Sequence, residues 1–191
     1  AAFNQVGGQN AISYYGPTMV KAALGDNIPN VEFLCSSLVG LVELIFTVVG
    51  MVLIDKAGRK PLLVSSAAGM GVFAAVMVFA FASNIGWLVV AGACGFIACF
   101  AFGLGPVTWV MIPELFPTYM RGRASGLCTV LLWGINFCVG QFTPMMFEGW
   151  GGAGTFVFWM IMDFLGAFLI FKFAPETKGK TLEEIQALWE K

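Results

Sequence analysis

The sequence has 191 residues, of which 59% are hydrophobic and 11% are charged. A soluble domain carries about a quarter charged residues, so this composition excludes an ordinary soluble protein and indicates an integral membrane protein. The absence of histidine excludes histidine catalysis, and a net charge of −1 without a basic patch excludes a nucleic-acid partner. The five cysteines lie in apolar stretches without metal-ligand spacing. We therefore expect no metal, no cofactor and no enzymatic activity.

Six apolar stretches have the length of about 20 residues with which a helix crosses a bilayer. They are predicted at 4–22, 31–54, 62–82, 86–112, 124–147 and 154–173. The lipid bilayer is thus the first partner that the sequence predicts. The charged tail at 175–191 is predicted to hold a short amphipathic helix with Leu182, Ile185 and Leu188 on one side.

The cations predict the orientation of these spans. Nine of the ten Lys and Arg residues lie in the loops at 55–61 and 113–123 or at and after the last span, and only Lys21 lies near the opposite face. By the positive-inside rule these loops and the tail are cytoplasmic. An even number of spans then places the N-terminus of the chain in the cytoplasm as well.

The first span is unusually polar for a membrane helix. Four amides fall within seven residues, at Asn4, Gln5, Gln9 and Asn10, with two glycines between them. Amides inside a membrane are unfavourable unless they are paired or face a cavity. Hydrogen bonding between helices is the simpler explanation. The number of amides favours a polar cavity, because amides both donate to and accept from hydroxyl groups such as those of a sugar.

The second span contains an acid near its middle, Glu43, which lies 12 residues before Asp55 and therefore about 18 Å from the cytoplasmic end. An ionised carboxylate facing lipid there would cost several kcal/mol, so Glu43 should face the interior. Three interpretations remain open: a neutral acid that bonds a substrate hydroxyl, which we favour, a titrating group that couples protons, or a structural partner of another helix. Asp163 in the last span is expected to have a packing role.

The fourth span should be interrupted. Proline lacks a backbone donor and clashes with the preceding turn, so a helix that passes Pro106 must kink or break, and Gly103 and Gly105 supply the necessary freedom. In lipid such a break is tolerated only against protein or along a water-filled cavity. Trp109 follows one turn later. A kinked packing helix with a buried Trp109 is the alternative.

Charged residues cluster at two of the predicted cytoplasmic loops. Asp55 and Arg59 flank the short loop after the second span, and Glu114 precedes Arg121 after the fourth. A loop that only sets the topology would explain them. We favour a latch in which these charges pair across helices in one conformation and separate in another.

Four motifs connect these features. The fourth span and its loop read GxGPxxWxxxxELFP followed by RxR, the first span reads NQxxGxNxxxYY, the second loop reads DKAGRK, and residues 175–179 read PETKG. Together they resemble the sugar porters, the glucose and xylose transporters of the major facilitator superfamily. The likeness covers essentially the whole chain, but only the C-terminal half of the family architecture. Asn4 and Glu43 depart from it, since the family usually has glutamine and asparagine there.

The resemblance implies an all-α integral membrane fold, with six transmembrane helices at 1–174 in two inverted three-helix repeats. It implies transport of a hexose, pentose or polyol by alternating access, as one half of a twelve-helix transporter in the plasma membrane. The chain should then be part of a longer protein, with an N-terminal six-helix half as its partner. Whether protons are also carried stays open. A six-helix scaffold without transport, or a half-transporter that self-assembles, is the alternative.

The resemblance also assigns roles to residues. The predicted substrate-binding residues are Gln5, Gln9, Asn10, Glu43 and Trp109. The predicted gates are Tyr14, Tyr15, Gly103, Gly105 and Pro106. The predicted cytoplasmic latch consists of Asp55, Arg59, Glu114 and Arg121.

Overall fold

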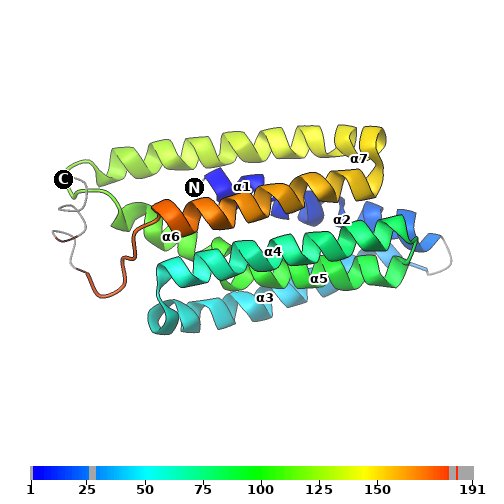
Figure 1. Cartoon of the computed structure of the whole chain (residues 1–191), viewed down its shortest axis with the longest axis horizontal. Coiled ribbons are helices and arrows are strands. Elements are labelled where there is room, and N and C mark those ends of the chain that lie inside the picture. The colour runs from blue at the N-terminus through cyan, green and yellow to red at the C-terminus, as the bar shows by residue number, and fades with distance from the viewer. Residues whose placement is uncertain (1, 26–28, 181–183, 185–191) are drawn as a thin grey trace.

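The computed structural model describes residues 2–25, 29–180 and 184, and every regular element in this part of the chain is an α-helix. The helices are α1 (Ala2–Val6), α2 (Gln9–Leu24), α3 (Val31–Ala57), α4 (Arg59–Ala82), α5 (Gly86–Phe102), α6 (Leu104–Glu114) and α7 (Arg121–Phe173). They lie roughly along one axis and form an elongated bundle (Figure 1). The predicted all-α architecture is confirmed. The helix predicted in the tail lies outside the described residues.

Two of the predicted spans consist of two helices each. The span at 4–22 is divided into α1 and α2 at Gly7 and Gly8, and the span at 86–112 is divided into α5 and α6 at Gly103. In contrast, α7 runs through both of the last two predicted spans. It folds back at Gly151, where φ is 70° and ψ is 177° (Figure 1). Glycine adopts a positive φ without steric cost, so the fold-back occurs at this residue.

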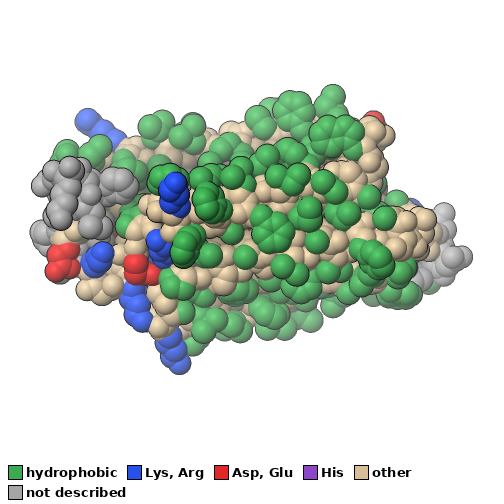
Figure 2. Space-filling model, in the orientation of Figure 1, with side chains coloured by type: hydrophobic (Ala, Val, Ile, Leu, Met, Phe, Trp, Pro, Cys, Tyr) green, Lys and Arg blue, Asp and Glu red, His purple; other side chains and the backbone are tan. Residues whose placement is uncertain are grey.

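By length and hydropathy, four helical stretches of the described chain are able to cross a membrane. They are α3, α4, the stretch Gly86–Glu114 and α7. Hydrophobic side chains cover the length of the face seen in Figure 2, whereas most of its Lys and Arg side chains gather at one end. This distribution suits helices that are surrounded by lipid along their length and reach water at their ends.

The core lies where α4 packs against α5 and against the second arm of α7, residues 152–173. Its largest fully buried side chains include Phe96 on α5, Phe156 on α7 and Met70 on α4. Phe81 of α4 stacks on Phe156 with ring centroids 5.7 Å apart. These contacts form the framework that carries the polar residues described below.

Helices α3 and α5 approach each other at Gly50. A Cβ atom at this position would lie 2.6 Å from the carbonyl oxygen of Phe102, which is too close for any side chain. Small residues allow such backbone contact between membrane helices. The end of α5, and hence the break at Gly103, is therefore packed directly on the backbone of α3.

We predict that Gly50→Ala lowers the free energy of unfolding by about 1–3 kcal/mol, because the new methyl group overpacks the contact with Phe102. Gly40→Ala on the same helix is the matched control. A Cβ at Gly40 would have no described atom within 4 Å, and alanine favours a helix over glycine by up to about 1 kcal/mol. Thermal unfolding of the purified chain in detergent measures both. Equal melting temperatures for the two variants would contradict the close packing of α3 on α5.

Candidate functional site

A cavity of about 380 Å³ lies between helices from both ends of the chain. Its lining consists of Asn4, Gln5, Gln9, Asn10, Tyr14, Glu43, Thr47, Phe100, Ala101, Gly105, Pro106, Trp109 and Trp133. All five residues that the sequence predicts to bind substrate are among them. The volume lies in the range of cavities that hold small molecules, and the lining combines aromatic rings with several polar groups.

The break between α1 and α2 places amides on this cavity. Gly8 has a φ of 84°, and a Cβ at this position would lie 2.5 Å from the ring of Trp159 on α7. Only glycine satisfies both conditions. Gln5 precedes the break, whereas Gln9 and Asn10 follow it, so the two short helices present their amides to the same space.

The amides form a chain of hydrogen bonds from α2 to α6. Asn10 donates its Nδ2 to Oε1 of Gln5, and Gln5 donates its Nε2 to Oδ1 of Asn4 at 3.0 Å. Asn4 in turn donates its Nδ2 to the carbonyl oxygen of Leu104 at 2.7 Å and to Oγ1 of Thr108 at 3.2 Å. Asn4 is buried and its amide is fully engaged, so it links helices, while Gln5 and Asn10 keep hydrogen-bonding capacity for a ligand.

The interruption of the fourth span lies at Gly103, three residues before Pro106. Pro106 sits in the first turn of α6, where the amide that proline lacks would have no partner inside the helix. The break that the sequence predicts at Gly103, Gly105 and Pro106 therefore lies at the first of these three residues. The freed backbone groups are bonded by Ser66 of α4, which donates to the carbonyl oxygen of Cys99 at 2.7 Å and accepts from the amide of Leu104 at 2.9 Å.

Ser66 was missed because a serine in an apolar helix, next to Ser65, gives no sign of what it bonds. Its side chain is fully buried, and a Cβ at Gly103 would lie 2.4 Å from the Cβ of Ser66. The close contact and the two hydrogen bonds together tie α4 to the interruption. This arrangement satisfies the requirement that a broken membrane helix finds other partners for its backbone.

The paired tyrosines connect α2 with the first arm of α7, residues 121–150. Tyr15 donates its hydroxyl to the carbonyl oxygen of Gly140 at 2.9 Å, and Asn136 donates its Nδ2 to the hydroxyl of Tyr14 at 3.2 Å. Tyr14 also lines the cavity. The two side chains thus lie where a change in the packing of α2 on α7 would move them, and their role as gates stays a prediction.

Glu43 is half-buried and lines two cavities. It faces the amide cavity and also a smaller one of about 140 Å³ that includes Ser13 and Ser36. Among the described residues its carboxyl group has no hydrogen-bond or ion-pair partner. The described contacts do not decide the role of Glu43, and all three interpretations stay predictions.

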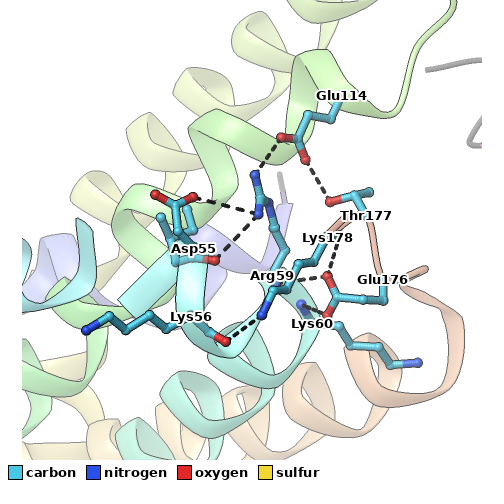
Figure 3. Close-up of polar contacts among 9 residues, drawn as sticks. Asp55, Lys56, Arg59, Lys60, Glu114, Glu176, Thr177 and Lys178 are labelled. Atoms are coloured by element: carbon cyan, nitrogen blue, oxygen red, sulfur yellow. Dashed lines mark hydrogen bonds and ion pairs between the residues drawn. The ribbon is translucent and has the colours of Figure 1, made fainter. Parts of the chain in front are cut away.

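A charged cluster occupies one end of the bundle (Figure 3). Arg59 Nη2 lies 3.1 Å from Oε1 of Glu114, and Arg59 Nη1 lies 4.0 Å from Oδ1 of Asp55. The second oxygen of Glu114 accepts the hydroxyl of Thr177 at 2.7 Å. Three of the four predicted latch residues therefore meet, joined by a residue of the tail. The pair with Asp55 is exposed and weak, whereas the guanidinium of Arg59 is mostly buried.

Arg121 does not reach this cluster. Its Nε donates to the carbonyl oxygen of Phe116 at 3.4 Å, and among the described residues it forms no ion pair with Glu114. The two carboxylate oxygens of Glu114 bond other residues, one Arg59 and the other Thr177. In this structure the predicted latch therefore consists of Asp55, Arg59 and Glu114 without Arg121.

Glu176 of the PETKG motif caps the first turn of α4 (Figure 3). Its carboxylate accepts the backbone amides of Arg59 and Lys60, each at 3.0 Å, and that of Lys178 at 2.9 Å. Burial alone would raise the pKa of Glu176, but the backbone hydrogen bonds from Lys178, Arg59, Lys60 and Thr177 outweigh it and hold this pKa below its usual range. The sequence identified the motif but not this contact.

Comparison with known proteins gives the family. The family model described as "Sugar (and other) transporter" matches residues 1–189 of the chain. The chain belongs to this sugar transporter family. It is 43% identical over 192 residues to the arabinose-proton symporter of Bacillus subtilis (strain 168), covering 99% of this chain and 41% of the relative. It is 38% identical over 196 residues to the D-xylose-proton symporter of Escherichia coli (strain K12), and this match covers 98% of this chain and 39% of the relative.

Solved structures give the fold. The chain superimposes with a TM-score of 0.89 and 33% identity on the proton:xylose symporter XylE bound to 6-bromo-6-deoxy-D-glucose, covering 98% of this chain and 41% of that one. An inward open conformation of the xylose transporter XylE from E. coli matches with a TM-score of 0.84 and 34% identity. This match covers 98% of this chain and 39% of that one. The fold is therefore that of the corresponding part of a major facilitator superfamily protein. This member of the sugar transporter family spans about two fifths of the length of the curated relatives it matches.

We predict that Glu176→Ala removes the cap of α4 and lowers the free energy of unfolding by about 0.5–2 kcal/mol at neutral pH. Because folding lowers the pKa of Glu176, its stabilisation is fully present above the unfolded pKa of about 4.3 and is lost as the pH falls through the folded-state pKa. Thermal unfolding of the wild type and the variant should thus differ near neutral pH and converge once the pH falls below the folded-state pKa.

The matched control for this prediction is Glu148→Ala. Glu148 is exposed and has no hydrogen-bond or ion-pair partner among the described residues. Its replacement should leave stability within about 0.5 kcal/mol of the wild type. If Glu176→Ala behaves in the same way at neutral pH, the capping contact does not stabilise the chain.

Proposed function

We propose that the chain forms one half of a sugar transporter that works by alternating access in the plasma membrane, with a second six-helix half completing the substrate site. The observation that carries this proposal is the cavity in which Gln5, Gln9, Asn10, Glu43 and Trp109 meet. The names of the relatives, arabinose-proton and D-xylose-proton symporters, support a pentose or hexose as the substrate class.

The chemistry of the cavity suits a sugar. The free hydrogen-bonding capacity of Gln5 and Asn10 accommodates hydroxyl groups that both donate and accept. Trp109 is 47% exposed, so its ring is open to the cavity and offers an apolar face to the C–H groups of a sugar ring. The carboxyl group of Glu43 has no protein partner among the described residues, which leaves it available to a hydroxyl or to a proton.

The amide chain couples this cavity to the interruption of the fourth span. A sugar that competes for Gln5 acts on Asn4, because Gln5 donates to the oxygen of Asn4. Asn4 holds the carbonyl oxygen of Leu104, the first residue of α6. Occupation of the cavity would thus change how firmly α6 is held at the break, which is the type of movement that gating requires.

The charged cluster closes one end of the same elements. Arg59 begins α4 and Glu114 ends α6, so their ion pair holds these helices together, and Thr177 adds the tail. Separation of Arg59 from Glu114 would free the end of α6. We infer that the cluster stabilises one transport conformation and opens in the other.

The membrane arrangement proposed for this half has six crossings in two inverted three-helix repeats. The first crossing is α1 with α2, the fourth is α5 with α6, and α7 supplies the last two on either side of Gly151. The end that carries the cluster of Arg59 and Glu114 is proposed to face the cytoplasm, because most Lys and Arg residues lie there.

Reconstitution into liposomes tests the transport function. The chain joined to a matching N-terminal half should exchange labelled pentose or hexose, whereas the chain alone should not, because half of the site would be missing. Exchange by the chain alone would indicate a half-transporter that self-assembles. Absence of exchange by the joined halves would contradict the proposal and favour a scaffold without transport.

In the same assay Trp109→Ala should raise the apparent Kd for the sugar about tenfold, which corresponds to about 1.4 kcal/mol, while thermal stability changes little. The matched control is Trp87→Ala, since Trp87 is exposed at the start of α5 and does not line the cavity. Normal affinity together with reduced stability in Trp109→Ala would assign this residue to packing alone.

Cysteine labelling tests the orientation. Single cysteines at Lys60 and Gly149, introduced into a variant without the five native cysteines, should differ in their reaction with a reagent that does not cross the membrane. Gly149 is exposed beside the fold-back and leaves room for a side chain. Only the cysteine at Gly149 should react from outside, because Lys60 lies at the positively charged end. Reaction of the cysteine at Lys60 from outside would contradict the proposed topology.

A further inference from the structure

Asp163 is an acid buried in the interior of the bundle. It lies on the second arm of α7, its residue is 2% exposed, and it faces the break between α1 and α2. A Cβ at Gly7 would lie 2.6 Å from Oδ1 of Asp163 and 3.1 Å from the end of Met70 on α4. The carboxyl group is therefore packed directly on the backbone of the break.

The part of the chain that the structure describes places no cation beside this acid. Among the described residues Asp163 forms no ion pair, and its Oδ2 is buried without a hydrogen-bond partner. The neighbours that the contacts identify are the backbone of Gly7, Met70 on α4 and Cys99 on α5. The thiol of Cys99 is the one titratable side chain among these three. The indole Nε1 of Trp159 is also buried without a partner, so two unsatisfied polar groups lie at this break.

Burial decides the protonation of such a group. An ionised carboxylate without a cation or hydrogen-bond donors would cost several kcal/mol in the interior of a membrane protein. The neutral acid is far less unfavourable, so the packed structure requires a proton on Asp163. Ionisation would instead require water at the carboxylate, and water enters only if the second arm of α7 moves away from Gly7.

The position of Asp163 connects this proton to the amide cavity. Gln5 lies two residues before Gly7 and Gln9 directly follows Gly8, and both line the cavity. The ring of Trp159, one turn before Asp163, packs on Gly8. Any movement of this arm away from Gly7 and Gly8 therefore changes the packing of the two short helices that carry the amides.

We propose that Asp163 is a proton-binding site of this chain. Its carboxyl group carries a proton while the second arm of α7 is packed on Gly7 and Gly8, and it releases the proton to water when this packing opens. Only the O–H bond breaks, and the carboxylate keeps the electron pair. Proton binding is a property of the chain itself, whereas its link to sugar movement rests on the proposed function.

Infrared spectroscopy tests the proton directly on the chain reconstituted in lipid. The sequence has three aspartates, Asp26, Asp55 and Asp163, so labelling aspartate with ¹³C separates them from Glu43. At neutral pH, where a water-exposed aspartate is ionised, the labelled chain should show the C=O band of a protonated carboxyl group. Asp163→Asn should remove this band. A spectrum that contains only ionised aspartate would overturn the proposal.

A second variant keeps this test valid if Asp163→Asn does not fold. The double variant Asp26→Asn, Asp55→Asn leaves Asp163 as the only aspartate, and Asp55 is exposed in the structure, so folding should be preserved. The band of the protonated group should persist in the double variant. Its disappearance would assign the proton to another aspartate and overturn the proposal.

Sugar exchange by the chain joined to a matching N-terminal half tests the link to movement. Asparagine mimics the neutral acid, so Asp163→Asn should retain exchange but lose its pH dependence, and the ratio of rates at acidic and neutral pH should fall to near unity. An unchanged ratio would contradict the link. If the wild type shows no exchange at all, the proposed function fails, while the infrared result still decides whether Asp163 binds a proton.

Discussion

The structure depends on one constraint: a helix that is interrupted inside a membrane must find partners for the backbone groups that it frees. At the break between α5 and α6 the residue Leu104 meets this constraint on both sides. Its amide donates to Ser66 of α4, and its carbonyl oxygen accepts from Asn4 of α1. The same two bonds hold the start of α6 against α1 and α4, and they thereby determine where Gly105, Pro106 and Trp109 line the cavity.

The break between α1 and α2 is linked to the first one through side chains. Gln5 and Asn4 form the connection on the cavity side, whereas Trp159 and Asp163 press on the glycines from the second arm of α7. The bundle thus places its two interrupted spans side by side, with polar groups between them. Polar residues in a membrane interior are unfavourable unless they are bonded, so their concentration at the two breaks, away from the lipid-facing surfaces, is the expected arrangement.

The charged cluster and the cavity are connected by the same two helices, α4 and α6. Helix α6 carries Trp109 on the cavity and Glu114 in the charged cluster, and α4 carries Ser66 at the break and Arg59 in the cluster. Helix α6 has 11 residues and is therefore a rod of about 16 Å, so a rotation at the break reaches the ion pair at its other end. Glu176 caps α4 from the tail, so the PETKG motif also stabilises the helix that carries Arg59 and Ser66.

Local rules in the sequence were sufficient for the helical fold and the residue types of the cavity, because hydropathy, proline and glycine act over a few neighbouring residues. The motifs were sufficient for the family. The tertiary structure alone decided that the break lies at Gly103, that Asn4 links helices, and that Arg121 stays outside the charged cluster. It also revealed the bonds of Ser66 and the buried carboxyl group of Asp163, which has no cation beside it among the described residues. Hydrogen-bond satisfaction and burial depend on groups that lie opposite in space, and Asn4 meets Leu104 across 100 positions of the chain.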